Sequence, residues 1–201
     1  IVTADHGEEL FDHGNVEHGR TLYEEQLRIP LLWSMPDGPG ESGDAGGAPV
    51  PGAGRRVALP IDQIDIAPTL LELAGLPLTP ELQGRSFAAF LRGGEPPAPR
   101  SSAAWLERLH FRQEAVASSG FKLIRDLQPP SVTAIASEEL FDLAADPRER
   151  RPLDEAGALR LDSLRAQLRG WRVLTGAPLE AETAAIDDRL RRELQALGYI
   201  Q

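Results

Sequence analysis

Apolar residues are spaced in two ways along the chain, and the change falls near residue 100. Before it, short apolar runs such as Ile1–Thr3 and Leu31–Trp33 lie between polar loops, as is typical of an α/β layer. The stretch 93–101, GGEPPAPRS, has no apolar periodicity. It is predicted to separate a first region, 1–93, from a second region, 101–201.

In the first region, Ile1–Thr3 predicts the end of a buried strand that leads into a polar loop. Thr21 and Glu24 match a capping box, in which the hydroxyl and the carboxylate each accept a backbone N–H, so a short helix is expected to run to about residue 28. Pro30 cannot continue that helix, and Leu31–Trp33 predicts a second buried strand. We expect these elements to belong to a parallel sheet.

The rest of the first region predicts a loop and a helix. Residues 36–56 are too rich in Gly and Pro to pack, so they are expected to form an exposed loop, with a domain linker as the alternative. Ile64–Leu76 predicts a helix, with Pro68 in its first turn and a stop signal at Gly75. Its core-facing residues are predicted to be Leu70, Leu71, Leu73 and Ala74.

The second region predicts a small antiparallel sheet covered by helices. Ser119-Gly120 is suited to a tight turn between the middle two strands. The expected strands are 103–109, 114–118, 121–125 and 139–143. Apolar residues at helical spacing then predict two helices over one face of the sheet, through Leu161, Leu164, Leu168 and Trp171, and through Leu190, Leu194 and Leu197.

Composition excludes several classes of function. The chain has 201 residues and a formal charge of -10, which argues against nucleic-acid binding because phosphate recognition needs clustered Lys and Arg. It has no cysteine, so disulfides, thiolate metal sites and a cysteine nucleophile within it are excluded. No apolar run is long enough for a transmembrane segment. Since the sequence opens on a strand pattern without Met, we expect the natural protein to extend upstream, and localisation stays open.

Three residues of the polar loop 5–19 are candidates for chemistry. Asp5 and His6 stand where a strand turns into a loop, so both side chains can reach one metal ion, and the pair alone does not choose the ion. A turn or capping role is the alternative. His18 directly precedes the predicted capped helix, whose N-terminal N–H groups favour an anion, and a neutral His18 could donate a hydrogen bond to that anion. The alternative is that His18 only orders the loop.

Several motifs, in order, resemble one family. They are TADHGEELFDHGNVEHGRTLYEEQLRIPLL, LPIDQIDIAPTLLELAGL, LQGRSF, FKLIRDL and EELFDLAADPRERRPL. Together they resemble the C-terminal portion of a formylglycine-dependent sulfatase of the alkaline phosphatase superfamily. The resemblance covers nearly all the chain and implies a partial α/β sandwich core, alkaline-phosphatase-like, followed by a small antiparallel sheet with helices.

The resemblance also implies roles for particular residues. In that family, two ligands near the N-terminus and a pair of ligands further along the sequence bind one divalent cation, and Asp5 and His6 match this second pair. The cation is most often Ca, with Mn, Mg or Zn as alternatives. His18, followed by Gly19, matches a residue that contacts the sulfate and assists the leaving oxygen. His110 resembles part of a segment near the substrate mouth and is a candidate substrate contact. The formylglycine nucleophile would lie upstream, since no Cys/Ser-x-Pro-x-Arg motif occurs in this chain.

The remaining polar residues are expected to have structural roles. His13 lies in a second Asp-His-Gly motif, for which the family resemblance gives no metal-binding role. Asp62 and Asp65 are expected to cap or flank the following helix. Glu8 and Glu9 are expected to be solvated in the loop.

Three functions are open on this evidence. The first is hydrolysis of a small-molecule or saccharide sulfate ester by the complete protein, with the isolated chain inactive. The second keeps the fold and changes the substrate to a phosphate or phosphonate ester. The third is a non-catalytic binding module or degenerate remnant.

Overall fold

The computed structural model describes residues 1–35, 56–108, 111–127, 137–154 and 158–175, with Arg189 and Arg192. Residues Ile1–Arg169 form one compact unit, and Gly170–Gln201 form a second one. The loop expected at 36–56 lies outside the described residues except for Arg56, as do His110 and nearly all of the helix expected around Leu194. The boundary at 93–101 stays a prediction.

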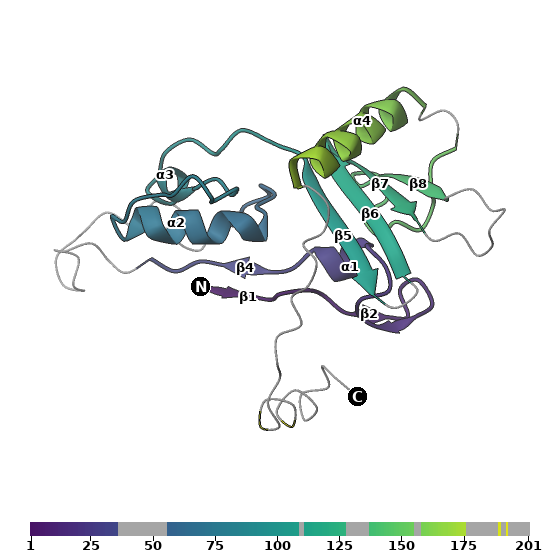
Figure 1. Cartoon of the computed structure of the whole chain (residues 1–201), viewed down its shortest axis with the longest axis horizontal. Helices are drawn as coiled ribbons and strands as arrows, with labels where there is room; N and C mark the ends of the chain where they lie inside the picture. The colour runs from purple at the N-terminus through teal and green to yellow at the C-terminus, as the bar shows by residue number, and fades with distance from the viewer. Residues whose placement is uncertain are drawn as a thin grey trace. The chain divides into compact units, whose positions relative to one another are not determined.

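The N-terminal part of the chain contains two short two-stranded sheets (Figure 1). Strand β1, Val2–Thr3, pairs with β4, Leu31–Leu32, so strands form at both predicted places. The prediction that they are buried was wrong for this chain, since Val2 is 63% and Leu32 is 59% exposed. Strand β2, Glu9–Leu10, pairs with β3, Val16–Glu17, within the polar loop. All strand pairs among the described residues are antiparallel, so the parallel pairing expected for this region is not found in that part of the chain.

Helix α1, Glu24–Leu27, begins two residues later than the capping-box prediction places it. Its N-cap residue is Tyr23, whose side chain makes no capping hydrogen bond. The Thr21 hydroxyl oxygen instead accepts a hydrogen bond from the Gln26 amide nitrogen at 2.6 Å. The carboxylate of Glu149 accepts the backbone N–H of Glu24 at 2.6 Å, so a distant residue takes the place of the local cap. The capping-box prediction was therefore wrong.

A 3-10 helix, η1 (Gln63–Asp65), leads into helix α2, Ile66–Leu73, which packs against α3, Ala88–Leu91. Asp62 is the N-cap of η1, and its backbone N–H donates to Asp65 Oδ2, as expected for residues that flank a helix start. The predicted core face of α2 is found only in part, because Leu71 and Leu73 are half-buried but Leu70 is 45% exposed, while Pro68 and Thr69 are buried. The Thr69 hydroxyl explains this, since it donates to the Asp65 carbonyl and accepts the N–H of Phe87 on the adjacent segment.

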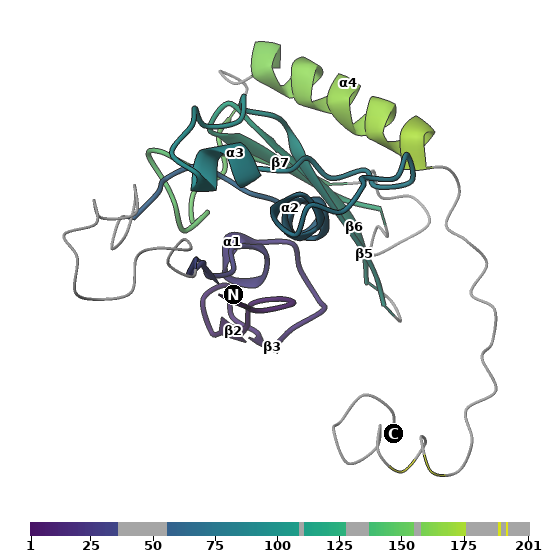
Figure 2. The same cartoon turned by 90° about the vertical axis from the view of Figure 1, so that its left-hand side faces the viewer.

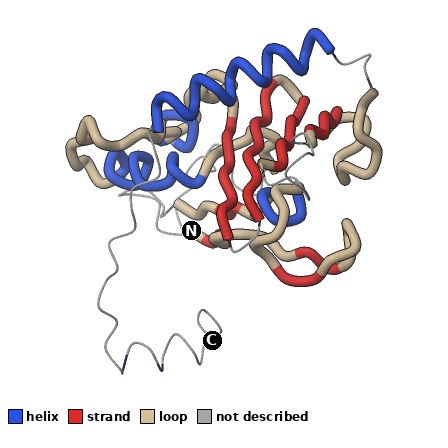
Figure 3. The backbone as a smooth tube through the Cα atoms, turned by 45° about the vertical axis from the view of Figure 1, so that its right-hand side comes forward, coloured by secondary structure: helices blue, strands red, loops and turns tan. Residues whose placement is uncertain are grey.

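Four antiparallel strands in the order β5-β6-β7-β8 form the sheet predicted for the second region (Figure 3). Their bounds are Ser102–Arg108, Phe111–Ser118, Phe121–Asp126 and Glu138–Asp142. Ser119 and Gly120 have φ of 52° and 82° between β6 and β7, as a two-residue type I′ turn requires. The strands and the tight turn are confirmed.

Both faces of this sheet are buried, each by a different part of the chain. Helix α4, Ala158–Thr175, places Leu164 and Leu168 on Val116, Leu123 and Leu140. On the opposite face, Leu22 and Tyr23 pack around Ile124 and Phe141. Figure 2 shows α4 on one side of the strands and α1 on the other. The sheet therefore supports the segment that carries α1 and the polar loop.

Candidate functional site

Gln26 on α1 holds the two ends of the polar loop. The backbone N–H of Gly7 donates to the Gln26 carbonyl at 2.8 Å, and that of Gly19 donates to Gln26 Oε1 at 2.9 Å. Gly7 has to be glycine, because a Cβ there would lie 1.9 Å from the Glu25 carbonyl oxygen. Gly19 has a φ of +76°, and a Cβ on it would lie 2.8 Å from Arg108 Nη1. The residue before each glycine is a candidate site histidine.

His6 and His18 are brought into contact by this arrangement. Their rings stack with centroids 4.0 Å apart and an interplanar angle of 29°. His6 Nδ1 lies 2.8 Å from the Gly7 carbonyl oxygen and must donate to it, which leaves the lone pair of a neutral imidazole on Nε2. His18 Nδ1 lies 3.3 Å from the Glu8 carboxylate and donates to it. One nitrogen of each ring therefore stays available.

Asp5 lies beside His6, with its Oδ2 3.7 Å from His6 Nε2. Its side chain is 77% exposed. The backbone at this point is fixed by Gln63, whose Nε2 donates to the carbonyls of Ala4 and Asp5 at 3.0 and 2.8 Å. Asp5, His6 and His18 thus form one exposed cluster, while His110 lies outside the described residues.

No group of three or more His, Cys, Asp or Glu side chains among the described residues is arranged to hold a metal ion. Asp5 and His6 supply two such side chains, and 3.7 Å between their atoms is compatible with one shared ion, since ligand distances run from about 2.0 to 2.6 Å. The pair fits part of a metal site.

The anion site predicted at the N-terminus of the following helix is wrong for this structure. The carboxylate of Glu149 already occupies the first N–H of α1. Arg108 on β5 instead brings positive charge to the cluster, because its Nη1 donates to the His18 carbonyl at 2.9 Å. The anion that α1 stabilises is therefore part of the protein.

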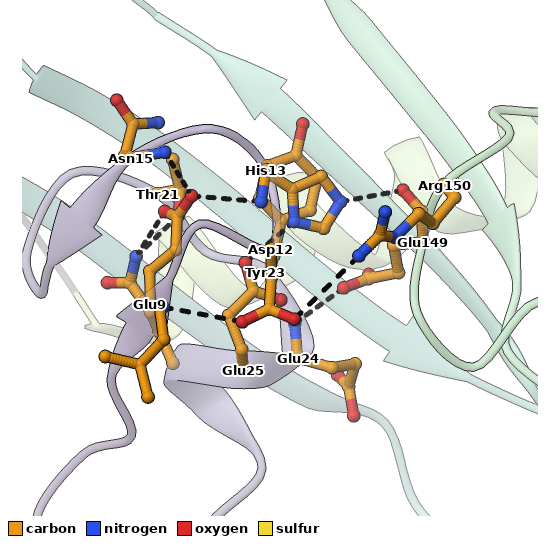
Figure 4. A network of polar contacts seen from close by, with 12 residues as sticks. Glu9, Asp12, His13, Asn15, Thr21, Tyr23, Glu24, Glu25, Glu149 and Arg150 are labelled. Carbon is orange, nitrogen blue, oxygen red and sulfur yellow. Dashed lines mark hydrogen bonds and ion pairs between the residues drawn. The ribbon is translucent and has the colours of Figure 1, made fainter.

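Glu9 and His13, also in the polar loop, have structural roles in a network of polar contacts (Figure 4). Glu9 is fully buried, contrary to its predicted role in solvating the loop, and its Oε1 accepts the N–H groups of His13 and Asn15. His13 stacks on Tyr23 with centroids 3.7 Å apart, and its Nδ1 lies 2.7 Å from Glu25 Oε1. Its structural role agrees with the expectation from the sequence.

The contacts of His13 favour its charged form. Its Nδ1 faces the Glu25 carboxylate and its Nε2 lies 3.0 Å from the Glu149 carbonyl oxygen. Both partners are acceptors, so satisfying both requires the doubly protonated ring. Burial lowers the pKa of His13, but the hydrogen bonds to Glu149 and Glu25 and the charges of both carboxylates outweigh burial, and the net pKa is raised.

Lys122 and Glu149 form a buried ion pair next to this network. Lys122 Nζ lies 2.9 Å from Glu149 Oε1 and 3.0 Å from Glu24 Oε1, and the side chains of Lys122 and Glu149 are 1% and 0% exposed. Burial raises the pKa of the Glu149 carboxyl, and the charge of Lys122 opposes that shift. Lys122 on β7 is thus paired both with Glu149, beyond β8, and with Glu24 on α1.

Comparison with known proteins identifies the family. Residues 11–170 match the family described as N-sulphoglucosamine sulphohydrolase, C-terminal, so the chain belongs to this family of sulfatase C-terminal regions in the alkaline phosphatase superfamily. Asp5 and His6 lie just before the matched residues.

Two curated relatives are sulfatases of Bacteroides thetaiotaomicron. The chain is 27% identical over 161 residues to a Delta 4,5-hexuronate-2-O-sulfatase, covering 76% of this chain and 30% of the relative. It is 28% identical over 157 residues to an N-acetylglucosamine-6-O-sulfatase, covering 74% and 25%. The chain therefore spans about a quarter to a third of the length of these relatives.

Solved structures agree on the fold. A 2-O GAG sulfatase superposes with a TM-score of 0.69 at 24% identity, over 95% of this chain and 39% of that one. A phosphonate monoester hydrolase from Silicibacter pomeroyi superposes with a TM-score of 0.63 at 25% identity, over 94% and 37%. The structure thus has part of the sulfatase fold. None of its described helices is long and apolar enough to span a membrane.

The sequence predicted Asp5, His6 and His18 as site residues, which stays a prediction, but it did not indicate the buried residues around them. Gln26, Glu9 and Glu149 were not assigned to the site, and each is buried. The available signal was the glycine after each histidine, which marks a close backbone approach.

Proposed function

We propose that the complete protein containing this chain hydrolyses sulfate esters. Asp5 and His6 supply part of the site for one divalent cation, most suitably Ca, and His18 contacts the sulfate group. The observation that carries the proposal is the cluster of Asp5, His6 and His18, with 3.7 Å between the Asp5 and His6 ligand atoms and 4.0 Å between the two rings. Family membership supports it.

The chemistry of each residue follows from its hydrogen bonds. The Gly7 carbonyl fixes His6 with its Nε2 lone pair available, as is typical of metal-binding histidines whose other nitrogen is anchored. When bound, the cation would neutralise charge on an ester oxygen. His18 donates through Nδ1 to Glu8, so its Nε2 can give a proton to the leaving oxygen only from the imidazolium form. The formylglycine nucleophile and further metal ligands would come from residues outside these 201.

The substrate class is a small-molecule or saccharide sulfate ester. The two Bacteroides relatives are a hexuronate-2-O-sulfatase and an N-acetylglucosamine-6-O-sulfatase, which points to sulfated hexuronate and glucosamine units. A solved relative with a TM-score of 0.64 was determined in complex with its substrate, D-glucosamine-2-N,6-O-disulfate. A phosphonate ester is the second candidate, because the superposition on a phosphonate monoester hydrolase is nearly as good as that on the sulfatase.

The test uses the complete protein with 4-nitrophenyl sulfate, sulfated disaccharides and an aryl phosphonate monoester. We expect His18→Ala to lower kcat on the preferred sulfate ester by about 100-fold or more, as for loss of an acid-base group. Gln167→Ala, on α4, is the control and should leave kcat unchanged. Turnover of the phosphonate ester alone would replace the proposal by the second candidate. Unchanged kinetics in His18→Ala would show that His18 only orders the loop.

Metal binding has its own test. Asp5→Asn should weaken Ca binding to the complete protein, measured by calorimetry without substrate, by about 10-fold or more, because a charged ligand becomes neutral. Unchanged affinity would remove Asp5 from the metal site. The isolated 201-residue chain is expected to show no esterase activity, and measurable turnover by it would contradict the division of the site between two parts of the protein.

A further inference from the structure

Gln26 contacts both segments that carry the candidate histidines, one through its backbone carbonyl and the other through its side chain. It lies on α1, is 4% exposed, and has no role in metal or substrate binding in the proposed function. Its backbone carbonyl accepts the N–H of Gly7, and its side-chain oxygen accepts the N–H of Gly19. The residues directly before these glycines are His6 and His18.

The side-chain amide uses both of its ends. Nε2 donates to the Thr21 hydroxyl at 2.6 Å and faces Glu9 Oε2 at 3.5 Å, while Oε1 accepts from Gly19. Only one orientation of the amide satisfies these partners, because a backbone N–H needs the oxygen and a carboxylate needs the nitrogen.

Other residue types would not satisfy this position. A glutamate would keep an acceptor for Gly19 but would place a second buried carboxylate beside Glu9, which is itself fully buried. A methionine would fill the same space and leave the N–H of Gly19 without this acceptor. Glutamine combines the acceptor and the donor that the site requires.

The two glycines transmit this position to the histidines. The peptide group of Gly7 packs directly on that of Glu25, where a Cβ would meet the carbonyl oxygen at 1.9 Å. Gly19 is held between Gln26 and Arg108. Because Gly7 is held by the main-chain carbonyl of Gln26 and Gly19 by its side-chain oxygen, the stacking of the His6 and His18 rings at 4.0 Å depends on the side-chain amide holding the Gly19 segment next to the Gly7 segment.

We propose that Gln26 is a positioning residue that sets the relative placement of His6 and His18. This inference rests on the proposed function for its effect on turnover, but its effect on the ring geometry does not. Loss of the amide lets the Gly19 segment move away from the Gly7 segment, and the two rings separate.

The experiment compares Gln26→Met and Gln26→Glu in the complete protein. On the substrate identified for the wild type, kcat should fall by about 10- to 100-fold with a smaller change in KM, the range found when an outer partner of a metal site is removed. The imidazole resonances of His6 and His18, assigned through His6→Asn and His18→Asn, should lose the ring-current shift caused by their stacking.

A double variant gives a stringent rescue. In Glu9→Gln/Gln26→Glu, the new carboxylate accepts from Gly19 and from the new amide at position 9, whose oxygen still accepts the N–H groups of His13 and Asn15. We expect it to recover at least half of the loss in kcat and the ring-current shift. The matched control is Gln167→Met on α4, which removes an acceptor from the Ser101 hydroxyl and should change neither readout.

The outcomes separate the two proposals. If the wild type turns over no sulfate ester, the proposed function fails, while the histidine resonances still test Gln26. If Gln26→Met keeps both the ring-current shift and the wild-type kcat, the positioning role is overturned. If the swap does not recover more than Gln26→Glu alone, the pairing of Glu9 with Gln26 is overturned as its basis.

Discussion

Replacing Lys122 by methionine tests whether buried charge holds the sheet to α1. Methionine keeps the length of the side chain and removes only the ammonium group. Glu149 is fully buried, and its Oε1 lies 2.9 Å from Lys122 Nζ, so the replacement leaves a buried carboxylate without its cation. Breaking a buried pair from one side destabilises proteins by about 3–5 kcal/mol.

The dependence on pH has a definite sign. Burial raises the pKa of Glu149 in the folded protein, so the stability linked to this carboxyl is complete below its ordinary pKa of 4.5 and is lost as pH rises through the folded pKa. Removal of Lys122 deletes the charge that opposes this shift. The difference in unfolding free energy between Lys122→Met and wild type should therefore grow from pH 4.5 to pH 7.

Urea unfolding of the complete protein at several pH values measures this difference. In Lys122→Met/Glu149→Gln, the glutamine oxygen can still accept the N–H of Glu24, and stability should return to within about 1.5 kcal/mol of wild type. Arg92→Met is the control, because its exposed pair with Glu72, at 3.9 Å, is worth less than about 1 kcal/mol. A loss below 1 kcal/mol for Lys122→Met at pH 7 would refute the reasoning.

Two further predictions concern the polar loop and its neighbours. The pKa of His13 is raised, so its contribution to stability is complete below pH 6.5 and is lost as pH rises through its pKa in the folded protein. His13→Gln should remove this loss of stability at higher pH. If the slope of unfolding free energy against pH is the same in His13→Gln and wild type, the charged form of His13 is contradicted. Gly7→Ala should destabilise the protein by about 1–3 kcal/mol through overpacking on the Glu25 carbonyl. In contrast, Gly170→Ala in α4 has nothing within 4 Å of the new Cβ and should stabilise by about 0.5–1 kcal/mol. Equal effects of both glycine substitutions in thermal unfolding would contradict the close approach at Gly7.

The elements that could be predicted from the sequence are those whose signal is local. The sheet of the second region was predicted because its strands are short apolar segments and Ser119-Gly120 allows two consecutive positive φ angles. Helix α4 was predicted from leucines at helical spacing, and Leu164 and Leu168 are buried as that spacing requires.

The errors arose where a distant residue replaced a local partner. Thr21 matches a capping box, but Glu149, 125 residues away from Glu24, accepts the N–H of Glu24. Leu70 has the spacing of a core residue, but the hydroxyl of Thr69 is needed between α2 and the segment at Phe87. A hydrogen-bond partner more than 15 residues away leaves no mark in the local pattern.

The candidate site could be predicted only in part, because some of its residues have a local sequence signal and others do not. Asp5, His6 and His18 could be chosen from a resemblance carried by sequence motifs. Glu9 could not be assigned, since a glutamate in a polar loop is typically solvated. Its burial follows from the N–H groups of His13 and Asn15, which converge on one carboxylate oxygen only in the folded loop.

The cap that Glu149 provides for α1 also orders events in folding. A helix of four residues does not form alone in water, because its nucleation is unfavourable, and the cap of α1 lies 125 residues further along the chain. Contacts between such distant residues form late, because a long loop must close first. Gln26 can therefore gather Gly7 and Gly19 only after β8 and the segment that follows it have docked. A nascent chain that has not yet emerged as far as Glu149 already contains the histidines of the site but not the scaffold that sets them side by side.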